Sequence, residues 1–125
     1  MSQMIDLTLP STVPGRTLHA FRCVPEGEVR AILQLSHGMV EFIDRYKPLA
    51  ESLAQRGILV TGNDHLGHGG SIRTKADYGY FAEPDGNRAV LEDLYSVTKL
   101  TKQLYPGVPY FLLGHSMGSF YARQY

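Results

Sequence analysis

A serine between two glycines is the residue of this chain best suited to covalent chemistry. The segment Gly114-His115-Ser116-Met117-Gly118 matches the pattern G-x-S-x-G, in which a sharp strand-to-helix turn exposes a serine hydroxyl as a nucleophile. The flanking glycines remove side chains that would clash with the following helix and the neighbouring strand. Because glycine and serine are common residues, the pattern alone is weak evidence. Its value depends on the elements around it.

A serine nucleophile also needs backbone N–H groups that stabilise the negative charge developing on the attacked carbonyl oxygen. We expect Met117 to supply one, because a helix that begins there directs its free N–H groups toward that charge. We expect Met39 to supply the second, from the loop after an earlier apolar run. In that loop Gly38 permits close backbone approach and His37 is predicted to order the chain. Each such donor typically contributes about 3 to 4 kcal/mol.

Four runs of apolar or alternating residues predict the strands that would hold these groups. The runs cover residues 18–24, 30–36, 58–63 and 109–113. With helices between them, their order is typical of an α/β fold: a mainly parallel sheet with helices on both faces. Sites in such sheets lie at the carboxyl ends of the strands. Those ends are the segments after Ser36, Asn63 and Leu113.

Two helices are predicted between these strands from apolar residues at three-and-four spacing. The first covers residues 45–56, with Pro48 near its start and Gly57 as its C-cap. The second follows Asn87, a plausible N-cap, and is stopped by Pro106 and Gly107.

The composition excludes several classes of protein. The chain has 125 residues, 43% of them hydrophobic, and a formal net charge of +0, so we expect at most one domain and no nucleic-acid partner. No apolar run approaches the roughly 18 residues of a membrane span. A single cysteine, Cys23, and an N-terminus without signal-peptide features favour a cytoplasmic location. The oligomeric state is left open.

Other polar clusters are weaker candidates for a site. Asp64, His65 and His68 could ligate a metal ion, but they lie among turn glycines with no fourth ligand nearby. The same glycines do not match the G-x-G-x-x-G phosphate-binding pattern. His115 is expected to have a structural role, with its side chain pointing away from the Ser116 hydroxyl. We therefore expect no metal ion and no cofactor.

Three segments together resemble the monoacylglycerol lipase and lysophospholipase branch of the α/β-hydrolases, which overlaps the serine aminopeptidase S33 family. The resemblance extends from about residue 30 to the end of the chain and rests on SHGMVEFIDRY, NDHLGHGGS and YPGVPYFLLGHSMGS. It implies an α/β-hydrolase fold with Ser116 as nucleophile and Met39 and Met117 as oxyanion donors. It also implies that the loop DHLGHGGS is a scaffold for the site.

The same resemblance implies an acid and a catalytic histidine after the nucleophile, in the order Ser, Asp, His. No Asp follows Ser116 in this chain. We therefore expect residues 1–125 to be the N-terminal part of a single α/β-hydrolase domain, truncated after the nucleophile-elbow helix and nearly inactive alone.

The predicted function is that of a serine hydrolase acting on carboxylic esters through an acyl-enzyme on Ser116. The resemblance suggests a small-molecule ester or lipid substrate, either a monoacylglycerol or a lysophospholipid. Two alternatives stay open. One is a serine aminopeptidase similar to proline iminopeptidase; the other is a truncated module without catalytic activity.

Overall fold

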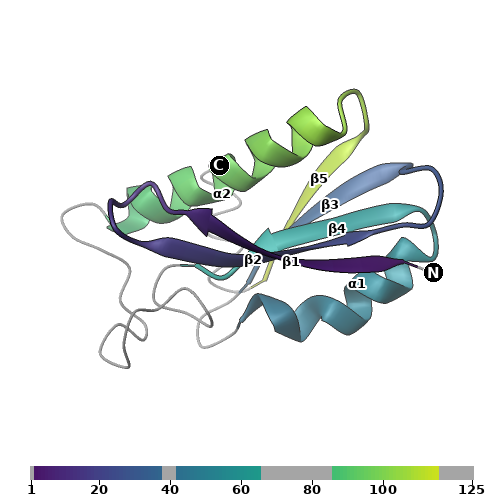
Figure 1. Ribbon diagram of the computed structural model, residues 1–125, viewed down its shortest axis with the longest axis horizontal. Helices are drawn as coiled ribbons and strands as arrows, with labels where there is room; N and C mark the ends of the chain where they lie inside the picture. The colour runs from purple at the N-terminus through teal and green to yellow at the C-terminus, as the bar shows by residue number, and fades with distance from the viewer. Residues whose placement is uncertain (1, 38–41, 66–85, 116–125) are drawn as a thin grey trace.

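The computed structural model describes residues 2–37, 42–65 and 86–115. These residues form one five-stranded sheet with the strand order β1-β2-β4-β3-β5. Helix α1 lies on one face of the sheet and α2 on the other (Figure 1). The strands are β1 (Gln3–Pro10), β2 (Thr17–Val24), β3 (Ala31–Ser36), β4 (Ile58–Asn63) and β5 (Tyr110–Gly114). The helical elements are the 3-10 turn η1 (Ile43–Tyr46), α1 (Lys47–Ala54) and α2 (Gly86–Leu104).

The parallel part of the sheet is β4-β3-β5, with β3 between its two partners. Leu35 pairs with Gly62 of β4 and with Leu113 of β5, and Ser36 pairs with Gly114. The three strands therefore end at the same edge of the sheet, as parallel strands joined by helical crossovers must. This edge is where the sequence places its candidate site.

Strands β1 and β2 extend the sheet in the antiparallel sense. Met4 pairs with Cys23 across the β1–β2 ladder, and Cys23 pairs in turn with Val60 of β4. Strand β1 was not predicted from the sequence. Its signal was available, since Ile5, Leu7 and Leu9 alternate with polar residues in the pattern of a half-exposed strand.

The helices begin and end close to the predicted positions. Pro48 occupies the second position of α1, where its missing N–H leaves no hydrogen bond unmade. Gly57 follows this helix with a φ of 82°, the conformation in which a glycine ends a helix most easily. The predicted cap of α2 was wrong: the helix begins at Gly86, which places Asn87 inside it. None of the helices in the described ranges is long and apolar enough to cross a bilayer.

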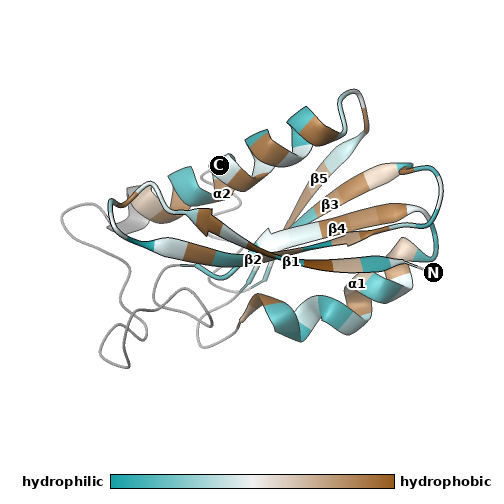
Figure 2. Ribbon diagram, in the orientation of Figure 1, coloured by the Kyte–Doolittle hydropathy of each residue, from teal (hydrophilic) through white to brown (hydrophobic). Residues whose placement is uncertain are grey.

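The two faces of the sheet are packed differently. Against α1 lies one buried apolar cluster, and Figure 2 shows the mixture of apolar and polar residues along both helices that this packing requires. The cluster consists of Phe21, Cys23, Leu35, Ile43, Ala50, Ala54 and Val60. On the side of α2 a polar residue, Gln34, is fully buried in the middle of β3 and is hydrogen-bonded to the helix.

Candidate active site at the carboxyl ends of three strands

Two of the predicted site residues lie in the described part of the chain, at neighbouring strand ends. Gly114 is the last residue of β5, and His37 directly follows β3. The predicted nucleophile, both oxyanion donors and two supporting glycines lie outside the described residues: Ser116, Met39, Met117, Gly38 and Gly118. The geometry of the site is therefore built from the strand ends that lead into and out of these segments.

The end of β5 is fastened to the end of β3 by main-chain pairing. Gly114 pairs with Ser36, and the N–H of His115 donates to the Ser36 carbonyl at 3.1 Å. His115 directly precedes the predicted nucleophile, and His37 directly precedes the predicted oxyanion segment. Pairing between β3 and β5 therefore places the residue before the predicted nucleophile beside the end of β3, where the predicted oxyanion segment begins.

His37 is buried, and its hydrogen bonding fixes its protonation. The backbone N–H of His65 donates to Nε2 of His37 at 2.9 Å, so that nitrogen is an acceptor and the ring proton lies on Nδ1. Nε2 also lies 4.0 Å from the Asp64 carboxylate. An ion pair there would need a proton on Nε2, which the His65 N–H excludes, so the neutral ring is the form that fits. Its Nε2 lone pair is already occupied by a main-chain donor, which does not suit a general base.

Asp64 follows the end of β4 and is 1% exposed. Its carboxylate accepts the backbone N–H of Ile43 at 2.6 Å. Its own N–H donates to the His19 carbonyl of β2 at 2.8 Å, so the residue continues the main-chain bonding of the sheet. The resemblance implied that the loop beginning at Asp64 is a scaffold for the site, but this contact with Ile43 was not predicted.

His65, which follows β4, joins the end of that strand to the end of β3. Its Nε2 lies 3.2 Å from the Ser36 hydroxyl, and its ring lies 4.2 Å from that of His37, tilted by 44°. All three side chains are buried. Buried polar networks of this kind specify one arrangement, because a broken member would leave its partners unsatisfied away from water. The ends of β3 and β4 are thus held together by side chains as well as by the ladder.

Metal-ligand spacing occurs elsewhere in the described residues, at Asp6, His19 and Asp44. These three residues belong to β1, β2 and η1, so no local sequence pattern predicts that they lie together. The ammonium of Lys47 lies 3.0 Å from Asp6 and 3.5 Å from Asp44, and His19 lies 2.9 Å from Asp44. The hydrogen bond that Lys47 donates to the Asp6 carboxylate raises the pKa of the lysine, so the carboxylates already have a cation. We assign this group to structure and not to metal binding.

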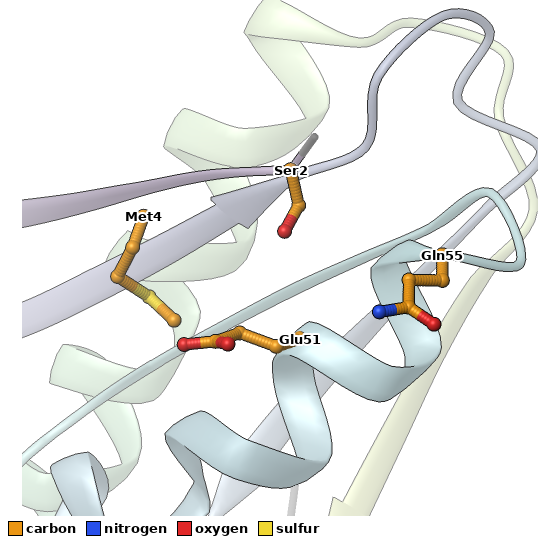
Figure 3. A pocket seen from close by; sticks show the side chains of 4 residues that line it. All are labelled: Ser2, Met4, Glu51 and Gln55. Carbon is orange, nitrogen blue, oxygen red and sulfur yellow. The ribbon is translucent and has the colours of Figure 1, made fainter.

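A surface hollow of about 330 Å³ lies between β1 and α1 (Figure 3). Its lining is Ser2, Met4, Glu51 and Gln55. Gln55 follows the end of α1, at the side of the sheet where β4 begins. The hollow is therefore remote from the strand ends, and we do not assign the chemistry to it.

Burial raises the pKa of the neighbouring thiol, Cys23, and disfavours its reactive thiolate form.

Comparison with known proteins gives a consistent result. A profile of the family described as serine aminopeptidase S33 matches residues 27–125. Human monoglyceride lipase is 40% identical over 116 residues, which are 90% of this chain and 35% of the lipase. The monkeypox virus monoglyceride lipase homolog is 42% identical over 93 residues, 72% of this chain and 30% of the viral protein. The chain thus spans about a third of the length of these curated relatives.

Solved structures agree with the sequence matches. The crystal structure of a highly thermostable carboxyl esterase from Bacillus coagulans, in complex with glycerol, has a TM-score of 0.90 and 30% identity to this chain. The match covers 100% of this chain and 40% of the esterase. A soluble variant of the Saccharomyces cerevisiae monoglyceride lipase shares the fold, with a TM-score of 0.72 at 24% identity over 94% of this chain and 37% of that structure. The chain belongs to the serine aminopeptidase S33 family of α/β-hydrolases, in its monoacylglycerol lipase-like branch.

Proposed function

We propose that this chain supplies the nucleophile and the oxyanion hole of an enzyme that hydrolyses carboxylic esters, with a monoacylglycerol or a lysophospholipid as substrate. One observation supports the proposal most strongly. The N–H of His115, the residue before Ser116, is bonded to the end of β3, from which the oxyanion segment departs. The names of the relatives, monoglyceride lipase and carboxyl esterase, favour the ester chemistry.

In the proposed reaction the Ser116 hydroxyl attacks the ester carbonyl carbon and its proton passes to a histidine base. The N–H groups of Met39 and Met117 stabilise the resulting oxyanion. Collapse of the tetrahedral intermediate expels the alcohol, which takes the proton, and leaves an acyl-enzyme on Ser116. Water then attacks the acyl group with the same histidine as base and regenerates the serine.

The histidine base and its acid have no candidates in this chain after Ser116. The relatives are about three times as long as the matched region, and we propose that the corresponding further part of the fold provides both groups. Without a base a serine hydroxyl is a poor nucleophile near neutral pH. The 125-residue chain alone should therefore hydrolyse esters at a rate close to that of buffer.

Amide chemistry is the second candidate, and the family description, serine aminopeptidase, favours it. Both reactions use the same nucleophile and the same oxyanion hole. They differ in the substrate pocket and in the protonation of the leaving group, which must be an amine and not an alcohol. A comparison of ester and amide substrates distinguishes the two reactions.

The test uses a chimera in which this chain replaces the matched 40% of the Bacillus coagulans carboxyl esterase; we call it the esterase chimera. It is assayed with a monoacylglycerol, a lysophospholipid and an aminoacyl arylamide, beside the isolated chain and Ser116→Ala. We expect ester hydrolysis by the chimera, about a 10³-fold or greater loss in Ser116→Ala, and no turnover by the isolated chain. Ester hydrolysis that survives Ser116→Ala would contradict the proposal.

A further inference from the structure

We propose that Asp64 is a positioning residue that holds the oxyanion segment, residues 38–41, in register with the nucleophile elbow. This inference rests on the proposed function, because it concerns the backbone N–H of Met39 as an oxyanion donor. It assigns to the acidic residue of the loop after β4 a role that is separate from the triad and from metal binding. Asp64 touches no reacting atom in this account and acts through the main chain of Ile43.

Both ends of the oxyanion segment are held by two consecutive residues. His37, before the segment, accepts the N–H of His65 at 2.9 Å. Ile43, shortly after the segment, donates its N–H to the Asp64 carboxylate at 2.6 Å. The two bonding partners, Asp64 and His65, are consecutive residues, so together they fix the position of Ile43 relative to His37.

Asp64 is itself fixed, as a positioning residue has to be. It continues from β4, which is paired to β3 on one side and β2 on the other. Its N–H is bonded to the His19 carbonyl at 2.8 Å, and its side chain is 1% exposed. A carboxylate so placed accepts a hydrogen bond that is shorter and stronger than a neutral pair would make. Asp64 therefore holds the Ile43 N–H at a fixed position relative to the sheet.

The side chain of Ile43 is held independently of its N–H. It is fully buried, and its Cδ1 lies only 2.6 Å from where a Cβ on Gly62 would be. Glycine at that point of β4 lets Ile43 pack directly on the sheet, which is a typical reason for glycine inside a strand. Next to it Asp44 lies 2.9 Å from His19. Apolar packing therefore fixes where the chain leaves the oxyanion segment, and Asp64 fixes the orientation of the peptide there.

The test compares Asp64→Ala and Asp64→Asn in the esterase chimera, with Asp93→Ala as the matched control. Asp93 is also 1% exposed and also accepts a backbone N–H, that of Thr12, but its partners lie in the turn between β1 and β2. Asparagine keeps an acceptor oxygen for Ile43 and loses the charge, whereas alanine removes both. Urea unfolding of each variant measures any general loss of stability.

We expect Asp64→Ala to lower kcat about 100-fold with KM changed less than about threefold, since a displaced donor weakens the transition state more than the bound substrate. Asp64→Asn should recover about tenfold of that loss because its oxygen still accepts the Ile43 N–H. Asp93→Ala should lower the urea midpoint and leave kcat within about twofold. A kcat that falls equally in Asp93→Ala and Asp64→Ala, in proportion to lost stability, overturns the inference.

Hydrogen exchange of the Ile43 amide separates failure of this inference from failure of the proposed function. We expect about 10-fold or faster exchange in Asp64→Ala than in the unmutated chimera, with the strand amides of β4 unchanged. If the chimera hydrolyses no ester, the proposed function fails, and unchanged Ile43 exchange would overturn the anchoring as well. If the chimera is active through Ser116 while Asp64→Ala keeps full kcat, only the positioning role fails.

Discussion

The two helices are held on the sheet by different kinds of contact. On the face of α1 the contacts are apolar, and Phe21, Leu35 and Val60 are fully buried beneath the helix. On the face of α2 a buried amide, Gln34, makes directional bonds instead. Its Nε2 donates to the Leu94 carbonyl at 3.0 Å, and its Oε1 accepts the hydroxyls of Thr98 and Tyr110. The face of α2 also has buried apolar residues, Val90 and Leu94, and adds these hydrogen bonds to them.

The difference suggests how each half of the candidate site is positioned. The proposed oxyanion segment precedes η1 in the chain, and Ile43 of η1 is part of the apolar cluster under α1. The elbow follows β5, whose Tyr110 is bonded through Gln34 to α2. Volume-conserving changes are tolerated in an apolar core, whereas a polar network fails when one member is removed. The elbow side should therefore be the more sensitive of the two to single substitutions.

Gln34→Leu is the most direct way to break the α2 side. It removes the hydrogen bond that Gln34 donates to the Leu94 carbonyl and the two that it accepts from the Thr98 and Tyr110 hydroxyls. We therefore expect a loss of about 2 to 3 kcal/mol in the free energy of unfolding. Urea unfolding followed by circular dichroism measures it. Thr98→Ser is the control, since it keeps the hydroxyl that donates to Gln34. A Gln34→Leu variant as stable as the unmutated chain would show that the network does not hold β5.

Gly62→Ala is the corresponding test of the α1 side. The added methyl would lie 2.6 Å from Ile43 Cδ1 and 3.0 Å from the Leu35 carbonyl, so we expect a loss of about 1 to 2 kcal/mol in unfolding free energy. Because Ile43 must move, kcat of the esterase chimera should fall as well. The double variant Gly62→Ala, Ile43→Val removes the closer clash and should recover part of both losses. Additive losses would mean that the two residues do not share this contact.

Asp93 of α2, which accepts hydrogen bonds from Ser11 and Thr12 before β2, should make the stability of the fold depend on pH. Burial raises its pKa above the ordinary 3.8, while hydrogen bonds from Thr12 and Ser11 act in the opposite direction. The folded state therefore binds the Asp93 proton more tightly than the unfolded state does. Stability relative to Asp93→Asn should fall as the pH rises from 3.8 through the folded-state pKa. Urea midpoints of both proteins across this range measure the difference. A relative stability that rises with pH would contradict the assignment.

Lys47→Met should have the smallest effect. The lysine bridges Asp6 and Asp44 at the surface, and exposed ion pairs contribute about 0.5 kcal/mol or less. The difference from the unmutated chain should shrink further in 1 M salt, where screening is strong. A loss above about 2 kcal/mol, independent of salt, would be too large for a surface pair and would point to a packing role for the lysine stem.

Periodicity predicted most of the elements, and local chemistry predicted where they stop. The apolar run of residues 58–63 is β4 to the residue, and Gly57 ends the preceding helical segment in the left-handed conformation. Strand β1 was not predicted, although Ile5, Leu7 and Leu9 alternate with polar residues. Strand order was not predictable from these patterns, since β2 is followed in the chain by β3 but pairs with β4.

The candidate site was predictable only in part, for a related physical reason. G-x-S-x-G and the glycine after His37 are local patterns, and the resemblance gave them roles. The contacts of Asp64 with Ile43 and of His65 with His37 join residues 21 and 28 positions apart. Such contacts depend on strand register and on which parallel strands are neighbours. No spacing along the chain encodes them directly.

The central claim is that Ser116 is the nucleophile presented at the ends of β3, β4 and β5. The most direct measurement is to treat the esterase chimera with an alkyl fluorophosphonate, digest it, and locate the adduct by mass spectrometry. The account predicts a single adduct on Ser116, formed together with loss of ester hydrolysis and absent from Ser116→Ala. An adduct on another residue, or full hydrolytic activity after Ser116 has been labelled, would contradict it.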